Sequence, residues 1–130
     1  MKLQESGENY LEAILVLQKR NGIARAVDVA TELGVSKPSV SRAVGILKEA
    51  GYVTIGNIGQ LLLTESGLQI AQNIYDRHCF IKECLIFLGV RAEVAEQDAC
   101  RLEHVLSEET LQCMKQHYLQ HGNSREAEIS

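Results

Sequence analysis

The sequence predicts a mainly α protein in which an N-terminal winged helix-turn-helix is followed by an all-helical second domain. Two observations carry this prediction. Residues 1–51 hold three stretches with apolar side chains at helical spacing, and a glycine-punctuated segment rich in strand-forming residues follows them. From residue 64 the helical spacing returns. We place the domains at residues 1–63 and 64–122, with a flexible polar tail at 123–130.

Three helices are expected before the glycine-punctuated segment. The first spans "NYLEAILVLQKRNG" and ends at Gly22, and the second lies in "RAVDVATELGV" and ends at Gly34. The third lies in "SKPSVSRAVGILKEAG", where Ser36 is a suitable N-cap, Pro38 is tolerated in the first turn and Gly51 follows the last turn. Its expected buried positions are Val40, Ala43, Val44 and Leu47.

The spacing changes in "YVTIGNIGQLLLT". Two short β-rich runs flank "GNIG", which predicts a hairpin with Gly56 and Gly59 supplying the turn conformations. A long helix then follows in "TESGLQIAQNIYDRHCFIKECLIFLGV", with Thr64 or Ser66 as its N-cap. "RAEVAEQDACRLEHVL" predicts another helix, and Ser107 opens the last one.

Composition limits the class of protein. A chain of 130 residues with 45% hydrophobic residues can bury a core without disulfide support. No apolar run approaches the length of a membrane span and the N-terminus is no signal peptide, so a soluble, cytoplasmic protein is expected. In that setting the four cysteines are expected to be free or to bind metal, with Cys79, Cys84 and Cys113 in the core.

Charge is distributed unevenly along the chain. The net charge is -4, but residues 1–62 carry 7 Lys and Arg against 6 Asp and Glu, whereas residues 63–130 carry 6 against 11. A near-neutral first half joined to an acidic second half is compatible with a DNA-binding domain joined to a cation-binding or dimerising domain.

The first domain is expected to bind double-stranded DNA. In a winged helix-turn-helix, the helix after the turn enters the major groove and the wing contacts the backbone or minor groove. The expected DNA-contacting residues at this helix are Ser36, Lys37, Pro38, Ser39, Ser41, Arg42 and Lys48. The wing, residues 56–60, carries no Lys or Arg, so we expect weak binding by one subunit and a dimer that spans two half-sites.

A candidate metal site lies in "CRLEHVLSEET". On a helical wheel Cys100, Glu103 and His104 gather on one side, opposite the apolar positions of the same helix. Thiolate, carboxylate and imidazole together suit a first-row divalent ion. Because one helix cannot complete such a site, further ligands are expected from His78 and from Glu12, with Asn9 a weaker candidate one turn before Glu12.

The order and spacing of several motifs resemble those of metal-dependent repressors related to the diphtheria toxin repressor and the manganese transport regulator. The motifs are "NYLEAI", "VSKPSVSRAVGIL", "LTESG", "RHCFIKECLIFLGV" and "DACRLEHVLSEE", which cover residues 8 to 115. The resemblance implies a homodimer in which each subunit has a winged helix and an all-helical dimerisation domain. It implies no enzymatic activity, and it implies the short architecture, without an SH3-like domain.

The resemblance also implies a set of metal ligands. Glu12 matches an acidic ligand of the manganese-type members, and His78, Glu103 and His104 match ligands of both branches. Cys100 matches the iron-type branch, Asn9 stands where the family has Asp or Met, and Lys82 replaces a carboxylate. The implied cofactor is Mn²⁺ or Fe²⁺, with other divalent transition metals possible.

Two alternative functions remain open at this point. A thiol-based, redox-responsive winged-helix repressor would use Cys100 with Cys79 or Cys84, and its operator binding would survive chelation. A winged-helix protein-interaction module would never contact DNA, and the wing without basic residues favours it. A metal-dependent hydrolase using Glu103 as base is disfavoured, because the sequence has no phosphate-binding loop and no second acidic cluster.

Overall fold

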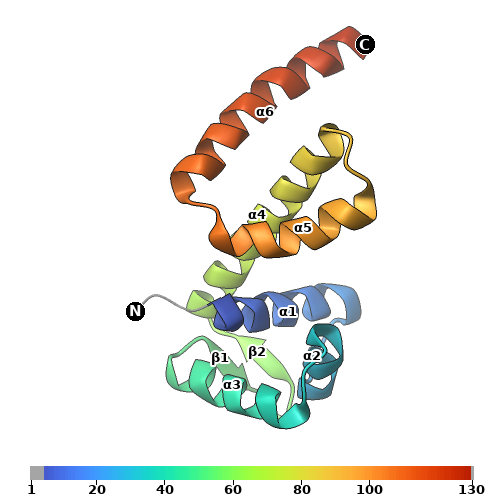
Figure 1. Cartoon of the computed structure of the whole chain (residues 1–130). Helices are drawn as coiled ribbons and strands as arrows, with labels where there is room; N and C mark the ends of the chain where they lie inside the picture. Colours follow the sequence, from blue (N-terminus) through green and yellow to red (C-terminus); the bar gives the residue numbers. More distant parts are fainter. Residues whose placement is uncertain (1–4, 130) are drawn as a thin grey trace. The chain divides into compact units, whose positions relative to one another are not determined.

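The computed structural model describes residues 5–129, with side chains described as far as residue 118. Its elements follow the predicted order and confirm the predicted fold class (Figure 1). They are α1 (Glu5–Asn21), α2 (Ala26–Leu33), α3 (Lys37–Glu49), β1 (Val53–Ile55), β2 (Leu61–Leu63), α4 (Glu65–Phe87), α5 (Ala92–Val105) and α6 (Glu108–Ile129).

The chain forms two compact units, residues 1–76 and 77–130, and the change from one to the other falls inside α4. The predicted domain boundary at residues 63 and 64 lies just before α4 and stays a prediction. None of the described helices is both long enough and apolar enough to cross a membrane.

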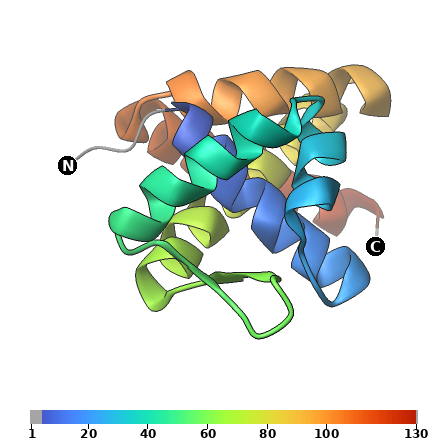
Figure 2. The same ribbon diagram turned by 90° about the horizontal axis from the view of Figure 1, so that it is seen from below.

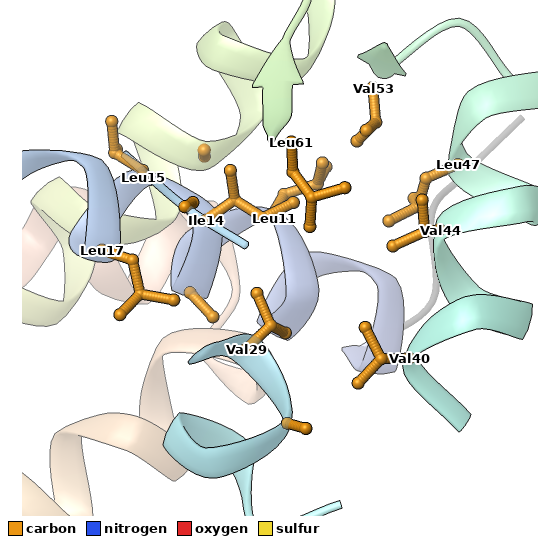
Figure 3. Close-up of a cluster of buried hydrophobic side chains, with 14 residues drawn as sticks. Leu11, Ile14, Leu15, Leu17, Val29, Val40, Val44, Leu47, Val53 and Leu61 are labelled. Atoms are coloured by element: carbon orange, nitrogen blue, oxygen red, sulfur yellow. The ribbon is translucent and has the colours of Figure 1, made fainter. Parts of the chain in front are cut away.

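The core of unit 1 is built around α1. Leu11 and Ile14 on this helix are fully buried, because apolar side chains from every other element of the unit surround them (Figure 3). The labelled core side chains in Figure 3 are Leu11, Ile14, Leu15, Leu17, Val29, Val40, Val44, Leu47, Val53 and Leu61. Each such side chain contributes roughly 1.5–3 kcal/mol when it is removed from water. This burial holds α3 and the hairpin in place on α1.

The turn between α2 and α3 has the predicted chemistry. Gly34 ends α2 in the left-handed conformation, with φ 66°, which a glycine adopts without a steric penalty. Ser36 is the N-cap of α3, and its Oγ accepts a hydrogen bond from the backbone N–H of Ser39 at 3.3 Å. The start of α3 is therefore fixed by local interactions alone.

Hydroxyl caps also begin α4 and α6. The Oγ1 of Thr64 accepts from the N–H of Gly67 at 3.1 Å, so Thr64 rather than Ser66 caps α4. Ser107 caps α6, accepting from the N–H of Thr110 at 3.1 Å. Both caps satisfy backbone donors that would otherwise lack partners at a helix start.

The wing is a two-stranded antiparallel hairpin, and its turn lies at the edge of unit 1 (Figure 2). Gly59 adopts φ 81°, as the turn prediction requires. The same prediction is wrong for Gly56, whose φ is not positive. A Cβ at Gly56 would lie 2.3 Å from the amide at the flexible end of the Gln60 side chain, which can rotate away, so lack of space alone does not require a glycine there. That amide lies over the turn and accepts a hydrogen bond from the N–H of Ile58 at 3.0 Å.

Gly67 allows α4 to approach the end of α3. A Cβ on this residue would lie 2.0 Å from the carbonyl oxygen of Tyr52, which is backbone and cannot rotate away. We expect Gly67→Ala to destabilise the protein by about 1–3 kcal/mol, in the range of overpacked sites. Gly45→Ala is the matched control, because nothing lies within 4 Å of a Cβ on this helical residue. It should stabilise by roughly 0.5–1 kcal/mol.

Urea unfolding of the parent and of the two variants compares these free energies directly. If Gly67→Ala and the parent have the same free energy of unfolding, the backbone at Tyr52 can shift without a loss of stability.

Unit 2 has a smaller core between the end of α4, α5 and α6. Ile81, Ala99 and Leu111 are buried at its centre. The ring of Tyr118 packs edge-on against Phe80 and Phe87, with both ring centroids at 5.7 Å. These contacts hold α4 against α6 and fix the surface on which α5 lies.

The cysteine predictions meet different outcomes. Cys84 is buried, as expected for a core residue, and Cys79 is half-buried. The prediction is wrong for Cys113, which is exposed on α6 in the single chain because its position on that helix faces away from Leu111. Helix α6 itself continues to Ile129 through most of the segment predicted as a tail. The flexibility of 123–130 stays a prediction, and residue 130 lies outside the described residues.

Candidate functional site

His78 is the centre of a polar cluster in unit 2. Its ring projects from α4 towards α5, with Nδ1 at 2.8 Å from Glu103 Oε2 and Nε2 at 3.0 Å from Glu96 Oε1. Both ring nitrogens therefore face carboxylates, which favours the doubly protonated ring. Hydrogen bonds with Cys100, Glu103 and Glu96 raise the pKa of His78 to about 11, although burial opposes the shift. Near neutral pH the ring is an imidazolium ion.

Three ligand types converge at this point. His78, Glu96 and Cys100 each offer one ligand atom, and these atoms all lie within 4.8 Å of one another. Glu96 and Cys100 are four residues apart on α5 and so share one face of that helix. Ligand atoms bind a first-row ion at about 2.0–2.3 Å, so small side-chain rotations suffice to bring these three onto one ion. The donor set of nitrogen, oxygen and sulfur fits a borderline divalent metal once His78 gives up a ring proton.

Glu103 links this cluster to the second predicted histidine. Its side chain is 1% exposed, and its Oε1 lies 3.1 Å from the Nε2 of His104, whose side chain is also 1% exposed. Since the other oxygen of Glu103 contacts His78, one buried carboxylate holds two imidazole rings. A buried carboxylate needs such partners, because an unpaired charge in this environment is costly.

The helical-wheel prediction for α5 is wrong in one respect. Glu103 does not lie opposite the apolar side, because it follows Ala95 and Ala99 along the same buried line of the helix. Val105, an apolar residue of the same helix, is 68% exposed. Burial on α5 follows contact with α4, where His78 supplies a polar partner for Glu103.

Glu96 is a site residue that the sequence analysis missed. Its position one helical turn before Cys100 was the available signal, since residues four apart on a helix are neighbours. The carboxylate accepts from His78 through Oε1 and from the ammonium group of Lys82 through Oε2, both at 3.0 Å. Partial burial raises the pKa of Glu96, but the hydrogen bonds from Lys82 and His78 outweigh this effect and lower it.

The predicted ligands of the first helix lie in unit 1. Asn9 and Glu12 are three residues apart on α1 and both are half-buried. Their part in a metal site stays a prediction from the sequence. Of the predicted ligands, the four in unit 2 lie in one connected cluster: His78, Cys100, Glu103 and His104.

The outer face of α3 is the candidate nucleic-acid interface. Val40, Val44 and Leu47 turn inwards, which leaves the predicted polar residues on the opposite side. Exposed there are Ser36, Lys37, Pro38, Ser41, Arg42 and Lys48, whereas Ser39 is half-buried. No ion pair engages Lys37, Arg42 or Lys48 within residues 5–118, so their charges are available to phosphates.

Two of these hydroxyl groups have structural partners. Ser36 caps the helix, and its Oγ lies 2.8 Å from the Oγ of Ser39. If the hydroxyl group of Ser36 or Ser39 contacts DNA, the same group must also keep its hydrogen bond at the start of α3. Lys37, Ser41 and Arg42 are not restricted in this way and are the stronger candidates among the predicted set.

A winged helix joined to a helical unit with a cluster of histidine, glutamate and cysteine side chains points to a class: DNA-binding regulators that respond to metal ions. Residues 2–57 match the family described as "Iron dependent repressor, N-terminal DNA binding domain". Residues 64–123 match its partner, "Iron dependent repressor, metal binding and dimerisation domain". The chain therefore belongs to the iron-dependent repressor family, and this membership confirms the resemblance.

Individual relatives agree with this membership. The transcriptional regulator MntR of Salmonella typhimurium is 37% identical over 119 residues, which cover 92% of this chain and 76% of that protein. The structure of IdeR from T. acidophilum superposes with a TM-score of 0.76 at 27% identity, covering 91% of this chain and 55% of that one. A manganese-dependent transcriptional repressor in complex with manganese gives 0.78 at 26% identity, covering 85% and 51%. The chain thus spans about half the length of these solved structures.

Proposed function

We propose that this chain is a metal-responsive transcriptional repressor that binds operator DNA as a homodimer when loaded with Mn²⁺ or Fe²⁺, and so controls metal homeostasis. The observation that carries the proposal is the convergence of His78, Glu96 and Cys100 in a chain that also has a winged helix. The names of its relatives, the transcriptional regulator MntR and a manganese-dependent transcriptional repressor, support the same function. The proposal assigns no catalytic role and places the protein in the cytoplasm.

His78, Glu96 and Cys100 are the ligands that the geometry favours in unit 2. Glu103 and His104 lie directly beside them and are proposed to contribute, as the resemblance implies. Glu12, and more weakly Asn9, are proposed as ligands from α1, which belongs to the DNA-binding unit. A bound divalent ion supplies positive charge that holds carboxylate, thiolate and imidazole together in place of protons.

The proposed response to metal is a shift in the population of conformations towards those that can bind DNA. Without metal, unit 1 samples orientations of which few suit two half-sites. A ligand on α1 shared with unit 2 restricts that sampling, so DNA binding costs less conformational entropy. A coupling of about 1–3 kcal/mol changes DNA affinity roughly 5–150-fold.

Exposed apolar side chains in unit 2 support the proposed homodimer. Leu88 is 75% exposed, Val105 68% and Ile86 44%, at the ends of α4 and α5. Apolar side chains of this size are commonly covered when subunits associate. Because the wing has no basic residues, one subunit is expected to bind DNA weakly. Dimerisation through the C-terminal helices supplies a second recognition helix for the second half-site. Sedimentation analysis of the full chain measures the oligomeric state.

Operator binding with and without metal tests the proposal. Fluorescence anisotropy with a labelled operator fragment should show binding with Mn²⁺ or Fe²⁺ and its loss on addition of a chelator. Cys100→Ala and His78→Ala should need far more metal for the same binding. Arg42→Ala should weaken DNA binding at saturating metal. It should also reduce the slope of log affinity against log salt concentration by about one, as expected for the loss of one phosphate contact. Operator binding that ignores chelator and both ligand substitutions would exclude a metal-responsive repressor.

A redox-responsive repressor remains the second candidate, because Cys100 is exposed and hydrogen-bonded with the cationic ring of His78. The thiolate is the form of a cysteine that peroxide oxidises. Here operator binding would respond to peroxide and survive chelation, whereas a metal-responsive repressor gives the opposite pair of results.

A further inference from the structure

Lys82 lies at the opening of the metal-ligand cluster. It is four residues after His78 on α4, so the two side chains leave the helix on the same face. Both reach the same carboxylate, His78 to Oε1 and Lys82 to Oε2 of Glu96. Lys82 is 37% exposed and Glu96 47%, whereas His78 is 12% exposed, so the ion pair lies on the solvent side of the ring.

A divalent ion that enters this cluster therefore meets two positive groups. The imidazolium of His78 can be neutralised by loss of a proton. The ammonium group of Lys82 is not among the converging ligand atoms, and it lies 3.0 Å from Glu96 Oε2, so its charge remains next to the ion. Its charge also acts on Cys79 and Cys100, the second of which is a proposed ligand.

We propose that Lys82 is a tethered competitor for the metal: its ammonium group occupies Glu96 in the metal-free protein and must be displaced when a divalent cation binds His78, Glu96 and Cys100. This inference rests on the proposed metal site. The displacement weakens metal binding and raises the metal concentration at which the regulator responds. A single side chain on α4 thus sets the threshold of the sensor.

Two substitutions separate the charge of Lys82 from its bulk. Lys82→Gln removes the charge and keeps a side chain that can hydrogen-bond, whereas Lys82→Arg keeps the charge. Metal affinity and stoichiometry are measured by isothermal titration with Mn²⁺ on the full chain. We expect Lys82→Gln to bind Mn²⁺ about tenfold more tightly than the parent does. An effect of this size is expected when a neighbouring positive charge is removed from a partly exposed site. Lys82→Arg should bind like the parent.

The salt dependence of metal affinity is a second readout, and a purely structural role of Lys82 would not produce it. Because the repulsion between Lys82 and the metal is screened, the difference between Lys82→Gln and the parent should shrink from about 0.05 M to about 0.5 M salt. Lys115→Gln, on α6 with its ammonium group over the ring of Phe80, is the control for removing a lysine from unit 2, and should leave affinity unchanged.

The outcomes distinguish this inference from the proposed function. Parent protein that binds no metal overturns the proposed function. Parent that binds metal, with Lys82→Gln binding equally or more weakly, overturns only the competitor role and leaves the metal site in place. Operator titrations should agree, with half-maximal binding of Lys82→Gln at about one tenth of the metal that the parent needs.

Discussion

Raising the pH from about 6.5 to about 8.5 is expected to increase the apparent metal affinity at least ~100-fold, because the His78 ring loses one proton for each ion bound and a thiol at Cys100 would lose another. The His78 ring donates one N–H to Glu103 and the other to Glu96, and one of these two protons is lost when the ring becomes a ligand. Hydrogen bonds with Cys100 and Glu103 raise the pKa of this ring to about 11, so the apo protein keeps the proton over the whole range. Each unit of pH below that pKa then changes the affinity about tenfold.

Competition between the protein and a metal-indicator dye, calibrated at each pH, measures this slope. Cys100→Ser is the control, since it removes any contribution from a thiol proton and should keep a slope of about one. A histidine with an ordinary pKa near 6.5 would already be neutral at pH 7.5 and would give a plateau above it. Such a plateau would show that the carboxylates do not hold the proton as described.

Glu103→Ala is expected to destabilise the metal-free protein by about 3–5 kcal/mol, the range for breaking a buried ion pair from one side. The carboxylate is 1% exposed and contacts one ring nitrogen of His78 at 2.8 Å and one of His104 at 3.1 Å. Its removal takes the hydrogen-bond acceptor from His78, removes a close contact of His104, and leaves a cavity on the buried line of α5 that also holds Ala99. Urea unfolding in the presence of a chelator measures the loss without any contribution from metal.

Glu96→Ala is the matched control for this experiment. Glu96 also accepts from His78, at 3.0 Å, but it is 47% exposed. Its removal should therefore cost less than about 1 kcal/mol, as at other solvent-exposed ion pairs. Similar losses in the two variants would mean that burial does not strengthen the Glu103 contacts. Glu103→Gln should fall between them, because it keeps the shape and one acceptor.

Much of the fold could be predicted because its determinants are local. Gly34 ends α2 and Ser36 begins α3 through atoms at most four residues away. The alternation of buried and exposed positions on α3 follows from the helical repeat, and Val40, Val44 and Leu47 are buried as that repeat requires. The hairpin was predicted from "GNIG", but the conformation of Gly56 was not, since its φ is not positive.

The candidate site was predicted in part. The helical wheel and then the family motifs led to His78, Cys100, Glu103 and His104, and the cluster in unit 2 contains all four. Glu96 was missed, because a glutamate one turn before a cysteine on a surface helix resembles a solvated charge until a partner from α4 is known. The roles of Glu12 and Asn9 remain predictions, since they lie in the other unit.

The sequence by itself determined the order of elements, their caps and the winged helix, because these depend on side-chain spacing and on backbone groups a few residues apart. Only the tertiary structure decided that Glu103 is buried, that Glu96 is shared by His78 and Lys82, and that His78 holds a proton where a metal is proposed to bind. The physical reason is that burial and charge depend on which side chains α4 and α5 bring together, and no spacing within one helix contains that information.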